Sequence, residues 1–158
     1  MVSLARAAIP SLSPKQSSAL ILLVQLKEAH EELGWAIEHV DQLTSGPQPK
    51  DDALANARWR ISQASLRRRA LAVQINDFLS ARLHGQDVAN LGALRRSDLQ
   101  LLRHSGLHVR VWTIHSIRDA WDSYCAASRE IRTLMKTHLL LERKLLCPLL
   151  ERVAHAVS

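Results

Sequence analysis

The chain has 158 residues, the size of one ordinary domain, and 47% of them are hydrophobic, which is enough for a sizeable core. Only five glycines, one tyrosine and one phenylalanine accompany abundant helix formers, so the composition favours an all-α protein and argues against strands, disorder or a multidomain enzyme. The formal net charge of +6 favours contact with anions of some kind.

The two cysteines and the apolar runs indicate the compartment. Cys125 and Cys147 lie within apolar helical pattern without CxxC spacing, and two thiols cannot build a disulfide framework. We predict that they are small buried residues in a reducing environment. The apolar run Ala19 to Val24 is far shorter than a membrane span, and the N-terminus lacks the long apolar region of a signal peptide. A cytoplasmic protein without membrane contact is therefore expected.

The first predicted helix begins after Ser13, because Ser13, Pro14 and Gln16 have the pattern of a capping box with proline at the first helical position. Residues 1–12 are predicted to be a flexible segment. Along the helix, residues at alternating steps of three and four form one stripe, the spacing that faces a partner helix. The stripe contains His30, which is expected to point inward with its neighbours Leu23, Leu26, Leu33, Ile37 and Val40.

The second predicted helix runs roughly from Asp52 to Leu83, after a Gly- and Pro-rich turn over residues 45–49. Arg68 is the one long charged side chain in its stripe, which is made of Leu54, Ala57, Ile61, Ala64, Arg68, Leu71, Ile75 and Phe78. Residues 84–92 break the pattern. A third helix is predicted from about Ala93, with His104 and His108 one turn apart on one face.

The last predicted helix follows a turn placed between Trp112 and Trp121, where Thr113 or Ser116 would cap a new helix. It runs to about Val153, and Pro148 is expected to kink or terminate it. Its predicted stripe consists of Ala127, Ile131, Leu134, His138, Leu141 and Leu145.

Four amphipathic helices with short connections predict an antiparallel up-down-up-down four-helix bundle over residues 13–158. Counting inward from the turns places His30, Arg68, His108 and His138 at about the same depth. We therefore predict one polar layer inside the bundle, with the three histidines pointing into a common cavity.

Metal sites in bundle cores use His and carboxylate side chains one turn apart, as His138 and Glu142 are, and as His104 and His108 are. The stretch from His138 to Leu150, HLLLERKLLCPLL, resembles the closing helix of the hemerythrin-like HHE domains. The segment LKEAHEEL around His30 resembles their opening helix, and HVRVW from His108 is similar to their third. The resemblance implies a non-haem di-iron centre for oxygen carriage, sensing or iron handling, with ligands at His30, His108, His138 and Glu142. The spacing of His104, one turn from His108, makes it a further candidate ligand.

One departure limits what this resemblance implies. The second helix of the family brings a histidine and a glutamate four residues apart, and those positions fall at Arg68 and Ala72. Arginine only donates hydrogen bonds and stays protonated, so it would repel a cation. The remaining ligands suffice for one metal ion and hardly for two. The first hypothesis is therefore a non-enzymatic bundle with a partial metal site that binds or senses iron or oxygen.

The alternative hypothesis is a metal-free basic bundle that acts as a protein-interaction or regulatory module. In it, Glu142 pairs with Arg68, and His30 and His138 hydrogen-bond around the pair, because a buried charge requires a partner.

No nucleophile is placed with a base and an orienting group, so an enzyme is not expected. Nucleic acid is disfavoured because the arginine runs lack interleaved aromatic residues. The four tryptophans are predicted to be core and helix-packing residues: Trp35, Trp59, Trp112 and Trp121.

Overall fold

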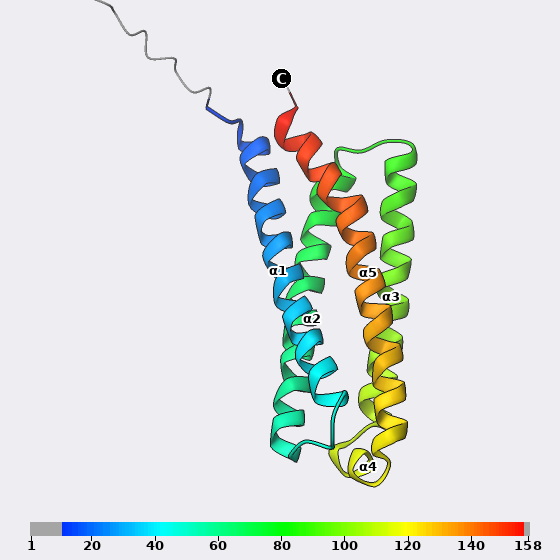
Figure 1. Cartoon of the computed structure of the whole chain (residues 1–158). Coiled ribbons are helices and arrows are strands. Elements are labelled where there is room, and N and C mark those ends of the chain that lie inside the picture. The colour runs from blue at the N-terminus through cyan, green and yellow to red at the C-terminus, as the bar shows by residue number, and fades with distance from the viewer. Residues whose placement is uncertain (1–10, 157–158) are drawn as a thin grey trace, which may run out of the picture.

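The structure is a computed structural model, and it describes residues 11–156. It is all-α, as predicted, and contains no strand within that range. Four long helices lie lengthwise beside one another, with a short helix at one end (Figure 1). The helices are α1 (Pro14–Thr44), α2 (Asp51–Ser80), α3 (Gln86–Val111), α4 (Ile114–Asp119) and α5 (Trp121–His155). The flexible segment predicted for residues 1–12 lies outside the described residues except for Ser11 and Leu12, which are in no helix.

The packing of the long helices is uneven. Helix α1 packs closely on α2 and on α5, and α5 also packs on α3 and α4. Within the described residues, α2 and α3 do not pack closely against each other. These two helices therefore flank an open side of the structure.

Helix α1 begins as the sequence predicts. The Ser13 side chain accepts a hydrogen bond from the backbone N–H of Gln16, and the Gln16 side chain accepts one from the backbone N–H of Ser13, so the capping box is complete. The six residues of the predicted stripe are all buried: Leu23, Leu26, His30, Leu33, Ile37 and Val40.

Helix α3 starts seven residues earlier than predicted, at Gln86 rather than Ala93. The start is set by Gly85, whose positive φ of 61° is accessible to glycine at little cost. Asp87 then lies in the first turn, where a carboxylate is favoured. The segment 90–92 is helical, because a single glycine weakens a helix without ending it.

The turn predicted between Trp112 and Trp121 is present and encloses α4, which Thr113 caps. Helix α5 continues through Pro148 to His155, so Pro148 does not terminate it, and the helix ends two residues beyond the predicted end at Val153. Its buried stripe is also displaced from the predicted one. Leu134 is 45% exposed, whereas Ser128 and Met135 are buried in its place.

The buried residues form apolar clusters on both sides of a polar layer. One cluster lies toward the start of α1 and includes Leu26, Ile75 and Leu146, and the next includes Leu33, Ala64 and Met135. Between them lie the buried polar side chains of His30, Arg68, His138 and Glu142. A third cluster surrounds Tyr124 at the α4 end, where Trp112 and Trp121 pack against it as predicted.

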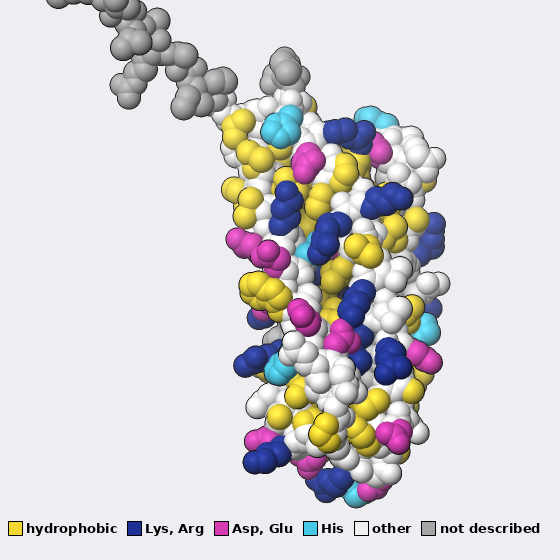
Figure 2. Space-filling view, viewed as in Figure 1, with side chains coloured by type: hydrophobic (Ala, Val, Ile, Leu, Met, Phe, Trp, Pro, Cys, Tyr) yellow, Lys and Arg dark blue, Asp and Glu magenta, His cyan; other side chains and the backbone are white. Residues whose placement is uncertain are grey.

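The outer surface carries mixed charges. The face seen in Figure 2 shows Lys and Arg side chains interspersed with acidic and hydrophobic ones rather than gathered in one basic patch. Cys147 is buried as predicted and Cys125 is partly buried, and both are free thiols. A stretch suited to spanning a lipid bilayer is not found in any helix of residues 11–156.

Candidate functional site

Four of the residues singled out in the sequence meet inside the structure: His30 of α1, Arg68 of α2, and His138 and Glu142 of α5. Each of these side chains is no more than 3% exposed. They meet because each occupies a stripe position at the same depth of its helix. The group is named here the buried network.

Glu142 is the centre of the buried network. One carboxylate oxygen accepts a hydrogen bond from His30 Nε2 at 2.8 Å. The other oxygen accepts from the guanidinium of Arg68 and from His138 Nε2, the latter at 3.1 Å. A carboxylate only accepts hydrogen bonds, so both histidine Nε2 atoms carry a proton. Glu142 is therefore held by three donors from three helices.

Helix α3 completes the buried network with Asp98, which the sequence reasoning missed. Its carboxylate accepts a hydrogen bond from Arg68 Nη2 at 2.6 Å and lies 3.4 Å from His138 Nε2. The neighbouring Ser97 hydroxyl lies 3.0 Å from His138 Nδ1, which orients the ring. Arg68 thus joins Glu142 of α5 to Asp98 of α3, while its Nε atom has no partner among the described residues.

The pKa of Glu142 reflects this environment. Burial alone would raise it, but the hydrogen bonds from His138 and His30 and the charge of Arg68 outweigh burial and lower the pKa from 4.5 to about 2. Glu142 is therefore ionised in the folded protein at any ordinary pH. The buried network is an ion pair supported by two histidines, and this is the arrangement that the alternative hypothesis predicts.

A pH-dependent stability follows from that lowered pKa. A carboxylate with a lowered pKa stabilises the fold fully above its unfolded value, near 4.5, and this contribution is lost as the pH falls toward 2. We expect the advantage of the parent over Glu142→Gln in free energy of unfolding to shrink by roughly 3 kcal/mol between pH 5 and pH 2. Urea unfolding of both proteins across that range measures it. A difference that stays constant down to pH 2 would contradict the lowered pKa.

His108 and His104 lie outside the buried network, so the predicted convergence of three histidines on one cavity is wrong. His108 is near the end of α3, half-buried, with its ring stacked on Tyr124 at 5.9 Å between centroids. His104 is exposed. The reason is the position of each residue along its helix. Arg68 lies twelve residues before the end of α2 and Asp98 lies twelve residues after the start of α3, so the two are at the same level. His108 lies ten residues beyond Asp98, which is about 15 Å further along the axis of α3.

The residues of the buried network do not fit a metal centre. Both oxygens of Glu142 are engaged by protein donors, and the guanidinium of Arg68 occupies the position where a cation would have to bind. Within residues 11–156, no group of three or more His, Cys, Asp or Glu side chains is arranged to hold a metal ion.

A second polar cluster, also missed in the sequence, ties α5 to the end of α1. Arg132, only 4% exposed, donates to Asp41 at 2.6 Å and to Thr44 at 3.0 Å, and it also binds Ser128. Lys136 bonds the other oxygen of Asp41 at 2.6 Å. Burial acts to raise the pKa of Asp41, but the two cations outweigh it and lower the pKa. This cluster engages all of its charges internally, which is typical of a structural role.

An open cavity of about 590 Å³ lies between α2 and α3 and reaches inward to α5 and α1. It is named here the α2–α3 cavity. Exposed side chains such as Leu66 and Val109 form its mouth, and the buried Ile131 and Met135 lie along its lining. His108 also lines it, and burial, together with Arg58 and Arg132, lowers the pKa of His108 to about 4.

Two tryptophans are exposed side by side on α1 and α2, against the prediction that they are core residues. Trp35 is 69% exposed and Trp59 is 62% exposed. Both line a depression of about 310 Å³ together with His39, Arg60 and other residues of the two helices. This surface is named here the Trp face.

Comparisons of the chain with protein-family models, with curated proteins and with solved structures find no match.

Proposed function

We propose that the chain is a metal-independent, non-enzymatic protein-interaction module, built as an antiparallel up-down-up-down four-helix bundle, that binds its partner through the Trp face. The exposure of Trp35 and Trp59 beside each other on two packed helices carries the proposal. Each tryptophan has a large apolar surface, and tryptophan is among the residue types that supply most of the binding energy at protein interfaces.

The charges around the two tryptophans favour an acidic partner. Arg60 lines the depression, and Arg67 at its edge is paired with Glu32. Glu32 is the one carboxylate among the described residues that line it. A partner that inserts an apolar anchor between the tryptophans and places carboxylates around it would match both features.

The buried network supports metal independence. Arg68 supplies inside the bundle the positive charge that a metal ion would supply in a hemerythrin-like protein. The competing hypothesis, binding or sensing of iron or oxygen, is favoured by the convergence of His30, His138 and Glu142. It requires the guanidinium to leave the carboxylate, and it predicts stoichiometric metal in the purified protein.

Comparative proximity labelling in cells tests the role of the Trp face. The double variant Trp35→Ser, Trp59→Ser is expected to label the specific partner at least about tenfold less than the parent does. Loss of one strong aromatic contact already weakens binding by that factor. Leu140→Ser is the matched control, since Leu140 is 62% exposed on α5. Binding of the purified partner to the three proteins then gives the change in Kd.

The outcomes are distinct. A partner that the control retains and the double variant loses supports the proposal. Labelling that is the same for all three proteins contradicts it. Concentration-dependent dimerisation of the parent, absent from the double variant in sedimentation velocity, would identify a second copy of the chain as the partner.

A further inference from the structure

We propose that the α2–α3 cavity binds a small amphipathic organic anion, a molecule with an apolar body and one anionic head group. The cavity shares Trp59 with the Trp face, but the inference does not depend on protein binding there. The inference rests on the size of the cavity, on the residues that keep it open and on the charges in its lining.

The size and lining of the cavity fit an apolar body. Its volume of about 590 Å³ lies within the range of roughly 300–1,000 Å³ that is usual for small-molecule sites. Val40, Ile131 and Met135 are buried residues from two helices that line it, and Ile61 and Tyr124 line it as well. A ligand that reaches this lining would remove apolar surface from water at both partners.

Small side chains keep the cavity open. Ser62 and Ser65 line it from α2, and Ser105 and Gly106 line it from α3. A Cβ atom placed on Gly106 would meet nothing within 4 Å. Larger apolar residues at these positions would fill the space between the two helices, so the opening is a direct consequence of the residue types found there.

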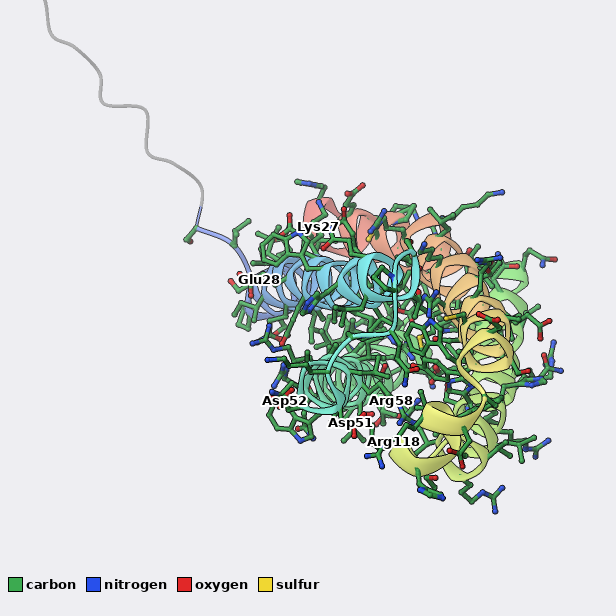
Figure 3. The ribbon with its side chains drawn as sticks, turned by 60° about the horizontal axis from the view of Figure 1, so that its bottom comes forward. Lys27, Glu28, Asp51, Asp52, Arg58 and Arg118 are labelled. Carbon is green, nitrogen blue, oxygen red and sulfur yellow. The ribbon has the colours of Figure 1, made fainter. Side chains whose placement is uncertain are left out.

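The charged groups in the lining are all basic. Arg58, Arg69 and Arg132 line the cavity, and the described lining residues include no Asp or Glu. Arg132 is already committed to Asp41. Arg58 donates to the backbone carbonyl of Trp112 and lies over the Tyr124 ring at 5.8 Å, at the α4 end seen in Figure 3.

Arg69 is the best placed group for an anionic head. Its Nε atom is buried and has no hydrogen-bond acceptor among the described residues, and the nearest carboxylate oxygen, of Asp98, is 3.9 Å away. Asp98 in turn is hydrogen-bonded to Arg68. The Arg69 side chain as a whole is 21% exposed, so a carboxylate or sulfonate in the cavity would give its guanidinium a closer anionic partner than Asp98. A charge-assisted bond to arginine is among the stronger hydrogen bonds.

Calorimetric titration with dodecanoate, below its micelle concentration, tests the site, with the aromatic sulfonate 1-anilinonaphthalene-8-sulfonate as a second probe. We expect one molecule of dodecanoate to bind per chain. Dodecanol, which lacks the charge, should bind with a Kd at least about tenfold higher. Arg69→Gln should weaken dodecanoate by a similar factor and leave dodecanol unchanged. Arg103→Gln, an exposed arginine of α3 outside the lining, is the charge-matched control.

A second pair of variants tests the cavity itself. Gly106→Leu places a large side chain in the opening of the cavity. It should abolish binding of dodecanoate and of 1-anilinonaphthalene-8-sulfonate. Gly34→Leu is its matched control, because Gly34 is also helical with nothing within 4 Å of an added Cβ but lies on α1 away from the cavity. Both changes replace a helical glycine and should preserve the fold. The inference is overturned if neither probe binds the parent, if Gly106→Leu binds as tightly as Gly34→Leu, or if dodecanol binds as tightly as dodecanoate.

Discussion

Arg68→Met is expected to lower the free energy of unfolding by about 3–5 kcal/mol at pH 7, a large part of the stability of a domain of this size. The substitution keeps a long side chain but removes the charge that faces Glu142 and Asp98. Glu142 is 1% exposed, so the substitution would leave a buried carboxylate that no cation faces. Urea denaturation measures the loss.

Arg67→Met is the control for this experiment. Arg67 is the preceding residue and is also paired with a glutamate, but both side chains of that pair are about half exposed. Exposed ion pairs contribute about 1 kcal/mol or less, so this variant should remain close to the parent. If Arg68→Met is no more destabilising than Arg67→Met, the buried pair does not stabilise the fold as described.

Combining Arg68→Met with Glu142→Gln separates the pair from its surroundings. A neutral amide can still accept hydrogen bonds from the two histidines and does not need a counter-charge. We expect the double variant to regain at least about 1 kcal/mol relative to Arg68→Met alone, because the two residues are in direct contact and their effects are not additive. Strictly additive losses would indicate that the two charges do not interact.

The second large effect is a gain of metal binding. Arg68→His combined with Ala72→Glu is expected to raise iron content from background to about one ion or more per chain, because two ligands one helical turn apart replace a repelling cation. Ala72 lines a small cavity of about 90 Å³ together with Asp98 and Glu142, so a carboxylate at this position would lie near two others. Elemental analysis after anaerobic reconstitution with ferrous iron measures the gain.

The control carries Arg68→Met and Ala72→Leu, which fill the same positions without ligands. After exposure to air, oxo-bridged ferric absorption in the near ultraviolet should appear only in the histidine and glutamate variant. A folded variant whose metal content stays at background would mean that these helices cannot frame a metal site. Stoichiometric iron in the parent would overturn the proposal of metal independence.

The residues of the buried network could be predicted wherever helical periodicity determined them. His30, Arg68 and His138 were expected to point inward because each continues a stripe, and they do. Asp98 was missed although it belongs to the same kind of stripe, four residues after Leu94 and three before Leu101. A predicted start at Ala93 instead of Gln86 shifts the expected position of the polar layer along α3 from Asp98 to His108.

The exposure of the tryptophans was predictable from spacing and was misjudged from residue type. Trp35 lies two residues from Leu33 and from Ile37, which places it on the opposite side of α1 from the buried stripe. Trp59 lies two residues from the buried Ala57 and on the outward side of α2. The prediction of a core position follows from the hydrophobicity of tryptophan alone and ignores this spacing. The α2–α3 cavity could not be predicted, because it depends on how far apart two helices settle when small residues face each other.

The bond between Arg68 and Asp98 divides the open side of the structure, between α2 and α3, into two compartments. It spans α2 and α3, with the α2–α3 cavity toward α4 and the small cavity around Ala72 on the other side. This partition limits the length of any occupant. The α2 lining of the larger compartment extends from Ala55 to Arg69, which is about 21 Å of helix. A molecule longer than that must either protrude into solvent or displace the salt bridge, so the same ion pair that stabilises the core sets an upper limit on ligand size.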